Sequence, residues 1–223
     1  MKYIDLSHKM TDKMNVYPGD HEFELKEIST SNDSYSLSKI SGGLHTGTHI
    51  DAPYHYIPNG KKVSDLEINS LIGKASILKT RNKSNKNNQN KNNKINDNNI
   101  ASKCIKIKDL NLKNSLEKII ILNTGYYKQW GKDSYFHEYP YISKELAKLL
   151  IENEISGIAI DTPSVDRTNH DDIHKIFLKN NVWIVENLTN MDKLKKDIYY
   201  SYFIPMNIKA EASYVRAFVE NMI

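Results

Sequence analysis

The stretch that decides the fold runs from residue 143 to residue 186, SKELAKLLIENEISGIAIDTPSVDRTNHDDIHKIFLKNNVWIVE. Apolar residues recur at helical spacing over 143–152 and 171–178, and the serine that opens the first of these segments is a good N-cap residue. Short apolar runs bounded by turn residues, at 157–160 and 182–185, are typical of buried strands. This alternation of helix and strand favours parallel strand pairing with crossover helices.

The rest of the chain adds mainly strands and turns. Further short apolar runs occupy residues 3–6, 36–40, 75–78, 119–122 and 214–219. We therefore predict an α/β fold, a mixed β-sheet with flanking helices. The sequence shows no internal repeat and no linker between two cores, so residues 1–223 are expected to form a single domain.

One segment differs from this pattern. Residues 82–99, NKSNKNNQNKNNKINDNN, contain ten Asn and four Lys among eighteen residues. Such a tract buries too little apolar surface to offset its ordering entropy, so we predict a disordered surface insert within the domain. The window 79–108 holds nine Lys and Arg against one Asp, and the excess of 31 basic over 27 acidic residues in the whole chain therefore comes from this region.

Composition also excludes several classes of protein. The single cysteine, Cys104, rules out an internal disulfide framework and is expected to be a strand residue. The N-terminus MKYIDLSHKM has no apolar signal region, and the aliphatic run at 119–122 is far too short to span a membrane. We expect a cytoplasmic protein with no membrane partner. A nucleic-acid partner, the interpretation from a different functional class, is not expected either, because the basic tract has no aromatic residue for base stacking.

The segment most indicative of function is residues 45–55, His-Thr-Gly-Thr-His-Ile-Asp-Ala-Pro-Tyr-His. Its glycine and proline argue against a regular helix, and an extended segment with a tight turn can bring His45, His49 and Asp51 to one side. Two imidazoles and one carboxylate suit zinc or manganese and leave positions open for water or a second ion. An isolated histidine is more often structural, but this clustering favours a functional site.

The motif HTGTHIDAPYH resembles the signature His-x-Gly-Thr-His-x-Asp-x-Pro-x-His of the cyclase family, which includes bacterial kynurenine formamidases and isatin hydrolases. The resemblance continues through YPGD at 17–20, LIG at 71–73, GIAIDTPSVD at 157–166, His174, ENL at 186–188 and VRA at 215–217. It implies a swivelling β/β/α-like single domain and a metal-dependent hydrolase of amide C–N bonds. It also implies a homodimer or a larger homo-oligomer.

The same resemblance implies a site with two divalent ions bridged by one carboxylate, with zinc as the expected metal and manganese as the other candidate. The ligands of the first ion would be His45, His49 and Asp51, and those of the second would be Asp51, His174 and Glu186. His55 would be the acid/base group, and Tyr17 would form part of a wall for the aryl ring of the substrate. We assign no role to Asp161, Asp166 or Arg216 from the sequence.

The expected reaction is hydrolysis of N-formyl-L-kynurenine to L-kynurenine and formate, since a divalent ion lowers the pKa of its bound water towards roughly 7. A cyclic amide such as isatin, or another small amide, is the alternative substrate, because the ligand motif sets the reaction type and the pocket walls set the specificity. A metal-binding relative without catalysis is the third possibility. The presence of His55 beside a full ligand set favours an enzyme.

Overall fold

The computed structural model describes residues 2–30, 32, 34–81, 104–112 and 115–221. The strands are β1 (Tyr3–Asp5), β2 (Glu24–Glu27), β3 (Ser38–Ser41), β4 (His49–Asp51), β5 (Ile72–Lys79), β6 (Cys104–Ile105), β7 (Ile119–Asn123), β8 (Tyr141–Ile142), β9 (Gly157–Ile160), β10 (Trp183–Glu186), β11 (Ile198–Pro205) and β12 (Ala212–Glu220). The α-helices are α1 (Ile68–Leu71), α2 (Lys144–Glu152) and α3 (Asp172–Lys179). Short 3₁₀ turns include η1 (Pro53–His55) and η5 (Tyr126–Gln129). No helix among these residues is long and apolar enough to cross a membrane.

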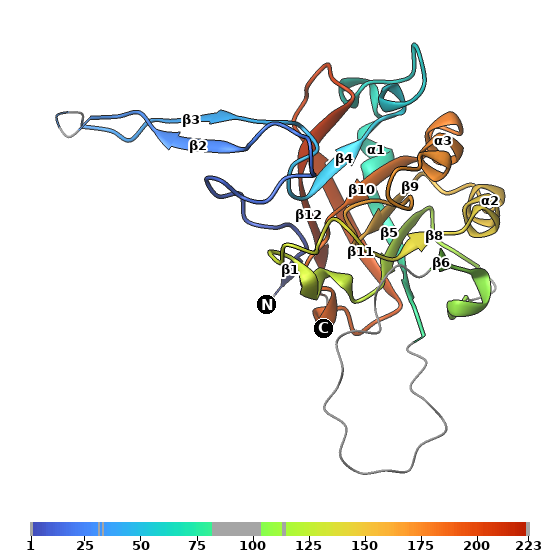
Figure 1. Cartoon of the computed structure of the whole chain (residues 1–223). Coiled ribbons are helices and arrows are strands. Elements are labelled where there is room, and N and C mark those ends of the chain that lie inside the picture. The colour runs from blue at the N-terminus through green and yellow to red at the C-terminus, as the bar shows by residue number, and fades with distance from the viewer. Residues whose placement is uncertain (1, 31, 33, 82–103, 113–114, 222–223) are drawn as a thin grey trace, which may run out of the picture.

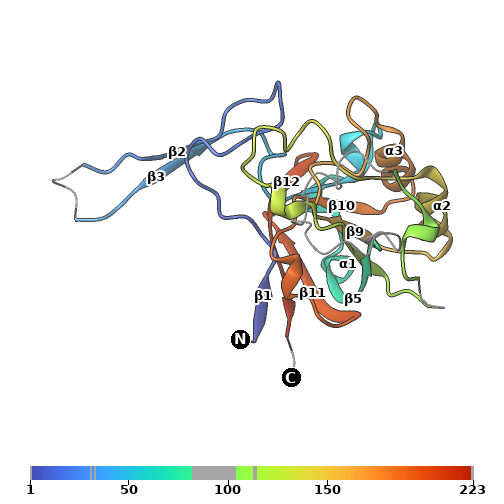
Figure 2. The same ribbon diagram turned by 60° about the horizontal axis from the view of Figure 1, so that its bottom comes forward.

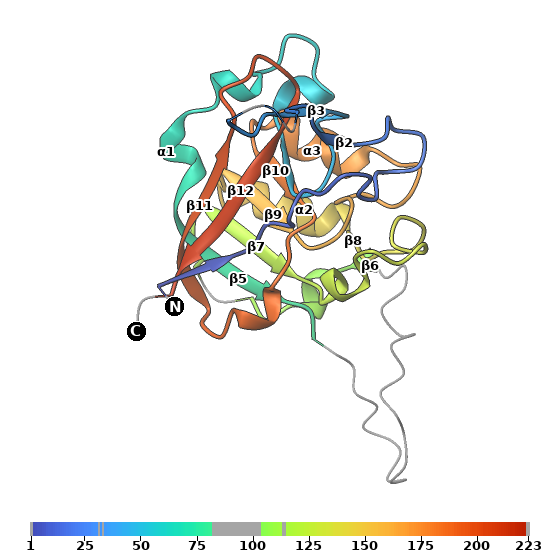
Figure 3. The ribbon, with the colours of Figure 1, turned by 90° about the vertical axis from the view of Figure 1, so that its left-hand side faces the viewer.

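Eight strands form one mixed sheet in the order β1-β12-β11-β5-β7-β9-β10-β4 (Figure 1). The central strands β5, β7, β9 and β10 run parallel, whereas β11, β12 and β4 join them by antiparallel pairing. This confirms the predicted mixed sheet and the parallel pairing expected where helices alternate with strands, at β9 and β10. One feature was not predicted: β4 pairs with both β10 and β12, which closes the sheet into a barrel-like ring (Figure 3).

Strand alternation divides the apolar residues between two cores. Inside the ring, Ile121, Ala159 and Val185 pack with side chains from β11 and β12. On the outer face of the same strands, Ile158 and Ile160 pack with apolar residues of α2 and α3, which lie together on one side of the sheet (Figure 2). Each parallel strand is thus buried on both faces, which explains its continuous apolar run.

The predicted helices are confirmed. The Ser143 side chain accepts a hydrogen bond from the Leu146 amide at 3.2 Å and so caps α2 as expected. Strands lie at every predicted run, within a few residues at their ends, and Cys104 opens β6. The short strands β2 and β4 and the tyrosine-rich β11 were not predicted. The predicted insert at 82–99 lies outside the described residues.

Strands β2 and β3 form a ribbon that projects away from the rest of the fold in both Figure 1 and Figure 2. Its base is fixed by Phe23, which is fully buried and makes an edge contact with the Tyr214 ring at 6.0 Å between centroids. Beyond that base the ribbon carries exposed large apolar side chains, namely Ile28, Tyr35, Leu37 and Ile40. A two-stranded ribbon has little stability by itself. Exposed apolar side chains gathered on such an element are typical of a surface that contacts another molecule.

The segment that follows β1 contains His8, whose ring packs against the loop that bears Trp130. The His8 ring stacks on the Trp130 indole, with centroids 3.8 Å apart and planes inclined by 15°. Its backbone amide donates to Thr48 Oγ1 at 2.8 Å, while its Nε2 atom is buried without a hydrogen-bond partner among the described residues. Burial lowers the pKa of His8 from 6.5 to about 4, because a proton on this nitrogen would be poorly solvated.

This shift predicts a pH-dependent stability. Because the folded pKa of His8 is about 4 and the ordinary value is 6.5, the unfolded chain takes up the proton first as the pH falls. The stability that neutral His8 supports above pH 6.5 is therefore lost on acidification, by about 2 kcal/mol at pH 5. The variant His8→Phe keeps an aromatic ring that can stack on Trp130 but has no group that titrates. Urea unfolding from pH 7 to pH 5 should show a smaller loss of unfolding free energy for this variant, and parallel curves would contradict the assignment.

Candidate metal centre

Strand β4 holds two of the predicted ligands by simple alternation. Ile50 points into the apolar interior of the ring, so His49 and Asp51 face outwards. In the antiparallel register of β4 and β10, His49 stands directly opposite Glu186, the last residue of β10. Directly paired residues share one face of a sheet, which brings the imidazole and the carboxylate together, with His49 Nε2 3.6 Å from Glu186 Oε2.

Helix α3 supplies the third element of the site from the outer side. His174 is buried on the helix face turned towards the sheet, with its Nε2 atom 3.3 Å from Glu186 Oε1 and 3.5 Å from Asp51 Oδ2. Its other ring nitrogen, Nδ1, lies 2.8 Å from Asp166 Oδ2. A proton on Nδ1 would be donated to Asp166, which leaves the Nε2 lone pair free to face the two carboxylates.

The segment before and after β4 contributes the two remaining histidines. His45 Nδ1 lies 2.9 Å from Asp51 Oδ1. His55 ends the turn η1, and its ring centroid is 4.3 Å from that of His45 and 5.8 Å from that of His174. All six predicted ligand and acid/base residues therefore meet at one place between β4, β10 and α3.

The spacing of these atoms fits a shared cation. Two ligands bound tetrahedrally to one zinc ion at about 2.0–2.1 Å lie roughly 3.4 Å apart. The contacts of His49 Nε2 with Asp51 Oδ1 and of His174 Nε2 with Asp51 and Glu186 measure 3.3 to 3.5 Å. Both oxygens of Asp51 are buried, and within the described ranges neither has a hydrogen bond of good geometry. A buried carboxylate with this environment is suited to hold a cation.

The ligand atoms fall into two groups that share Asp51. One group contains His45, Asp51 and His55, and the other contains His49, Asp51 and Glu186, with the ligand atoms of each within 4.8 Å of one another. The shared position of Asp51 suits a bridging carboxylate. The grouping differs from the predicted division in two respects. Glu186 lies close to His49 as well as His174, and a ring nitrogen of His55 lies within 4.8 Å of the ligand atoms of His45 and Asp51.

The electrostatics of the cluster follow from burial and mutual attraction. Burial alone would raise the pKa of Asp51, but the charges of His45 and His49 outweigh it and hold that pKa well below its usual range. Burial would lower the pKa of His174, yet the carboxylates of Asp166, Asp51 and Glu186 raise it well above 6.5. His55 behaves differently: burial lowers its pKa to about 4, so its imidazole is neutral at pH 7.

A second group of buried polar residues fixes the backbone of the ligand segment. Asn187 adopts a left-handed φ of 60° immediately after Glu186, a conformation that Asn tolerates better than most residues. Its Nδ2 donates to the Gly47 carbonyl at 2.9 Å, and its Oδ1 accepts from the Tyr135 hydroxyl at 2.8 Å. The Gly47 carbonyl also lies 3.0 Å from His49 Nδ1, which turns the Nε2 atom towards Asp51.

Sequence reasoning gave Asp166 and Asn187 no role, although both belong to the motifs that carry the resemblance. Asp166 accepts from the Ile173 and His174 amides as well as from the His174 ring. Its position before a helix that bears a candidate ligand is the signal that could have identified it. Asp161 instead accepts from Thr124 and Tyr127, and Arg216 pairs with Asp5 at 2.7 Å, so both of these lie in structural networks.

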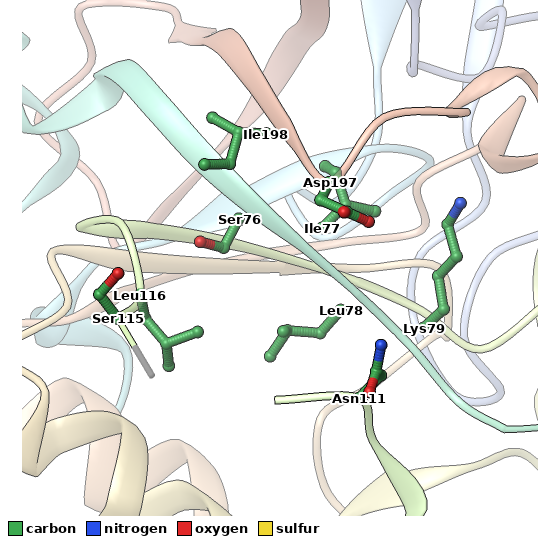
Figure 4. A pocket seen from close by; sticks show the side chains of 9 residues that line it. All are labelled: Ser76, Ile77, Leu78, Lys79, Asn111, Ser115, Leu116, Asp197 and Ile198. Carbon is green, nitrogen blue, oxygen red and sulfur yellow. The ribbon is translucent and has the colours of Figure 1, made fainter. Parts of the chain in front are cut away.

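The cluster forms the floor of a hollow of about 440 Å³. Aromatic side chains line its wall, namely Tyr17, Tyr56, Phe136 and Tyr139. Tyr17 makes an edge contact with Phe136 at 5.7 Å between ring centroids, so the structure places this predicted substrate-binding residue at the hollow. A smaller hollow of about 100 Å³ lies elsewhere, beside β5, and its lining of residues such as Ser76, Leu78 and Asp197 contains no histidine (Figure 4).

Comparison with known proteins agrees with this geometry. Residues 4–167 match the model of a family described as putative cyclase. The chain is 29% identical to a kynurenine formamidase of Bacillus cereus and 28% identical to one of Bacillus anthracis, in each case over 98% of this chain and 97% of the relative.

Solved structures show the same fold. A potential metal-dependent hydrolase with cyclase activity superposes with a TM-score of 0.75 at 21% identity, covering 100% of this chain and 98% of the other. Isatin hydrolase A from Labrenzia aggregata superposes with a TM-score of 0.79 at 19% identity, covering 98% and 93%. Because the family model matches most of the sequence and the fold agrees throughout, the chain belongs to the putative cyclase family.

Proposed function

We propose that the protein is a metal-dependent amide hydrolase that converts N-formyl-L-kynurenine to L-kynurenine and formate. The observation that carries this proposal is the convergence of three imidazoles and two buried carboxylates, one of which is Asp51, beneath an aromatic-walled hollow. The likeness to curated kynurenine formamidases along nearly the whole chain supports the choice of substrate. We further propose that residues 1–223 act as one domain and that the protein is cytoplasmic, which its single cysteine supports.

The residues proposed to hold the metal are His45, His49, Asp51, His174 and Glu186, with Asp51 between two zinc ions. Manganese is the other candidate, because imidazole and carboxylate ligands accept both metals. A divalent ion bound there would lower the pKa of a water molecule and polarise the amide carbonyl. Asp166 and the Gly47 carbonyl hold the His174 and His49 rings in place, so these side chains need little reorganisation.

His55 is proposed to move the proton. Burial lowers its pKa to about 4, so His55 is neutral at pH 7, and the ring nitrogen that carries no proton can accept one from the attacking water. The water oxygen then bonds to the formyl carbon, the carbon–nitrogen bond breaks, and His55 returns the proton to the departing aryl nitrogen. The aromatic wall that includes Tyr17 and Phe136 would hold the aryl ring during these steps.

We also propose that the protein is a homodimer or a larger homo-oligomer. The β2–β3 ribbon supports this, because Leu37 and Ile40 are exposed on an element that has almost no contact with its own fold. Burial of these side chains against a second copy would remove apolar surface from water.

The catalytic proposal predicts a metal-dependent activity. Chelation of the purified protein should abolish hydrolysis of N-formyl-L-kynurenine, and zinc or manganese should restore it. His49→Ala should remain inactive after metal is added, because the variant lacks one ligand of the group formed by His49, Asp51 and Glu186. Activity that survives complete chelation would refute the proposal, whereas restored hydrolysis of isatin alone would move the substrate to cyclic amides.

The role given to Asp166 predicts a loss of metal affinity without a loss of fold. Asp166→Asn weakens the partner of His174 Nδ1, and comparable changes behind metal-bound histidines reduce affinity by about 10- to 100-fold. Competition with a chromophoric chelator measures this directly. Asp172→Asn is the matched control, because Asp172 lies on helix α3, which also bears His174, and forms an exposed ion pair with Lys144. Equal affinities for both variants would argue against the role.

The oligomer proposal predicts a change of mass. Light scattering should give at least a dimer for the native chain and a monomer for the double variant Leu37→Asp/Ile40→Asp, since buried charges would oppose the interface. Ile68→Asp serves as the control, because Ile68 is 70% exposed on the separate helix α1. A monomeric native chain would contradict the proposal.

A further inference from the structure

The hollow above the metal centre has a charged rim whose use the hydrolytic chemistry does not explain. Besides the aromatic residues, the lining includes Asp20 and Arg167, which are both exposed, and Asp171. Asp171 is already neutralised by Lys175, whose Nζ lies 2.6 Å from its carboxylate. In contrast, neither the Arg167 guanidinium nor the Asp20 carboxylate has a side-chain hydrogen bond or an ion pair within the described part of the chain.

Arg167 is held in a fixed relation to the metal centre through its backbone. It directly follows Asp166, whose carboxylate is bonded to the His174 amide and ring. On its other side, Thr168 Oγ1 donates to the His137 carbonyl at 3.0 Å, and the His170 amide donates to the Arg167 carbonyl at 3.0 Å. An exposed arginine is usually a solvated surface residue, but this one is anchored beside a ligand at the edge of the hollow.

Asp20 is positioned by a turn that also carries an aromatic residue of the wall. Its amide donates to the Tyr17 carbonyl at 3.0 Å, so the carboxylate follows the wall residue by one turn. The rim therefore offers one positive and one negative group, both accessible and both without a partner of their own among the described residues. Their opposite charges are complementary to those of a zwitterionic α-amino acid, which carries a carboxylate and an ammonium group.

We infer that Arg167 and Asp20 bind the α-amino-acid group of the substrate. The inference rests on the proposed function, because it places the formyl group at the metal centre, the aryl ring at the wall and the amino-acid group at the rim. The planar guanidinium binds the substrate carboxylate through two parallel hydrogen bonds, and Asp20 accepts from the ammonium group. A site with these charges favours N-formyl aryl amines that carry an amino acid over neutral formanilides.

The experiment compares two substrates that share the reacting bond. N-formyl-L-kynurenine carries the amino-acid group, and formanilide does not. Arg167→Gln should raise the KM for N-formyl-L-kynurenine by roughly 10-fold or more, the usual effect of losing a hydrogen-bonded charged contact, with little change in kcat. Its kinetics with formanilide should remain native. The KM of Arg167→Lys should lie between those of the native enzyme and Arg167→Gln, because lysine retains the positive charge but lacks the planar group that makes two parallel hydrogen bonds.

Arg81→Gln is the matched control, because Arg81 is exposed and contacts Asn111 away from the hollow. Binding of L-kynurenine and its desamino analogue by calorimetry separates the two charges. Arg167→Gln should weaken both ligands, whereas Asp20→Asn should weaken only L-kynurenine. A native enzyme that hydrolyses neither substrate would refute the proposed function, and the calorimetry would still decide the binding roles. Equal effects of Arg167→Gln on both substrates, or unchanged affinity for L-kynurenine, would overturn the inference.

Discussion

The double pairing of β4 is the constraint on which the rest of the structure depends. This three-residue strand lies between β10 and β12, and its middle residue, Ile50, is buried in the interior of the ring. A shift of one residue would turn Ile50 outwards and bury His49 and Asp51 among apolar side chains. The hydrophobic effect that selects the register is therefore also what presents the ligands on the outer face.

The site carries an electrostatic cost that the fold alone does not repay. Two carboxylates and their histidines are removed from water, and buried charges of this kind stabilise a protein only when they are fully compensated. The surrounding residues show how the compensation is arranged. Asp166 and Asn187 are buried polar groups whose side chains hold ligand-bearing segments in place. Such a concentration of buried polar groups is typical of a site maintained for function at the expense of stability.

Much of the fold could be predicted from local pattern, because α2 and α3 have apolar residues at helical spacing, Ser143 caps α2, and β7 and β9 are continuous apolar runs. The pairing of strand β4 could not, since a histidine and an aspartate flank its single isoleucine and its partners β10 and β12 are distant in the sequence. Within the site, the segment 45–55 was evident from spacing, whereas His174 and Glu186 were found only through family resemblance. Asn187 acts on distant partners, Gly47 and Tyr135, and no local pattern reveals such a role.

The position of β4 in the chain has a consequence for the order of folding. It is synthesised early, yet both strands that receive it come late, since β10 begins at Trp183 and β12 ends at Glu220. A chain growing on the ribosome therefore holds a histidine-rich segment without a partner until almost the whole sequence has emerged. Closure of the ring therefore depends on contacts between segments far apart in the chain, a kind of contact that slows folding.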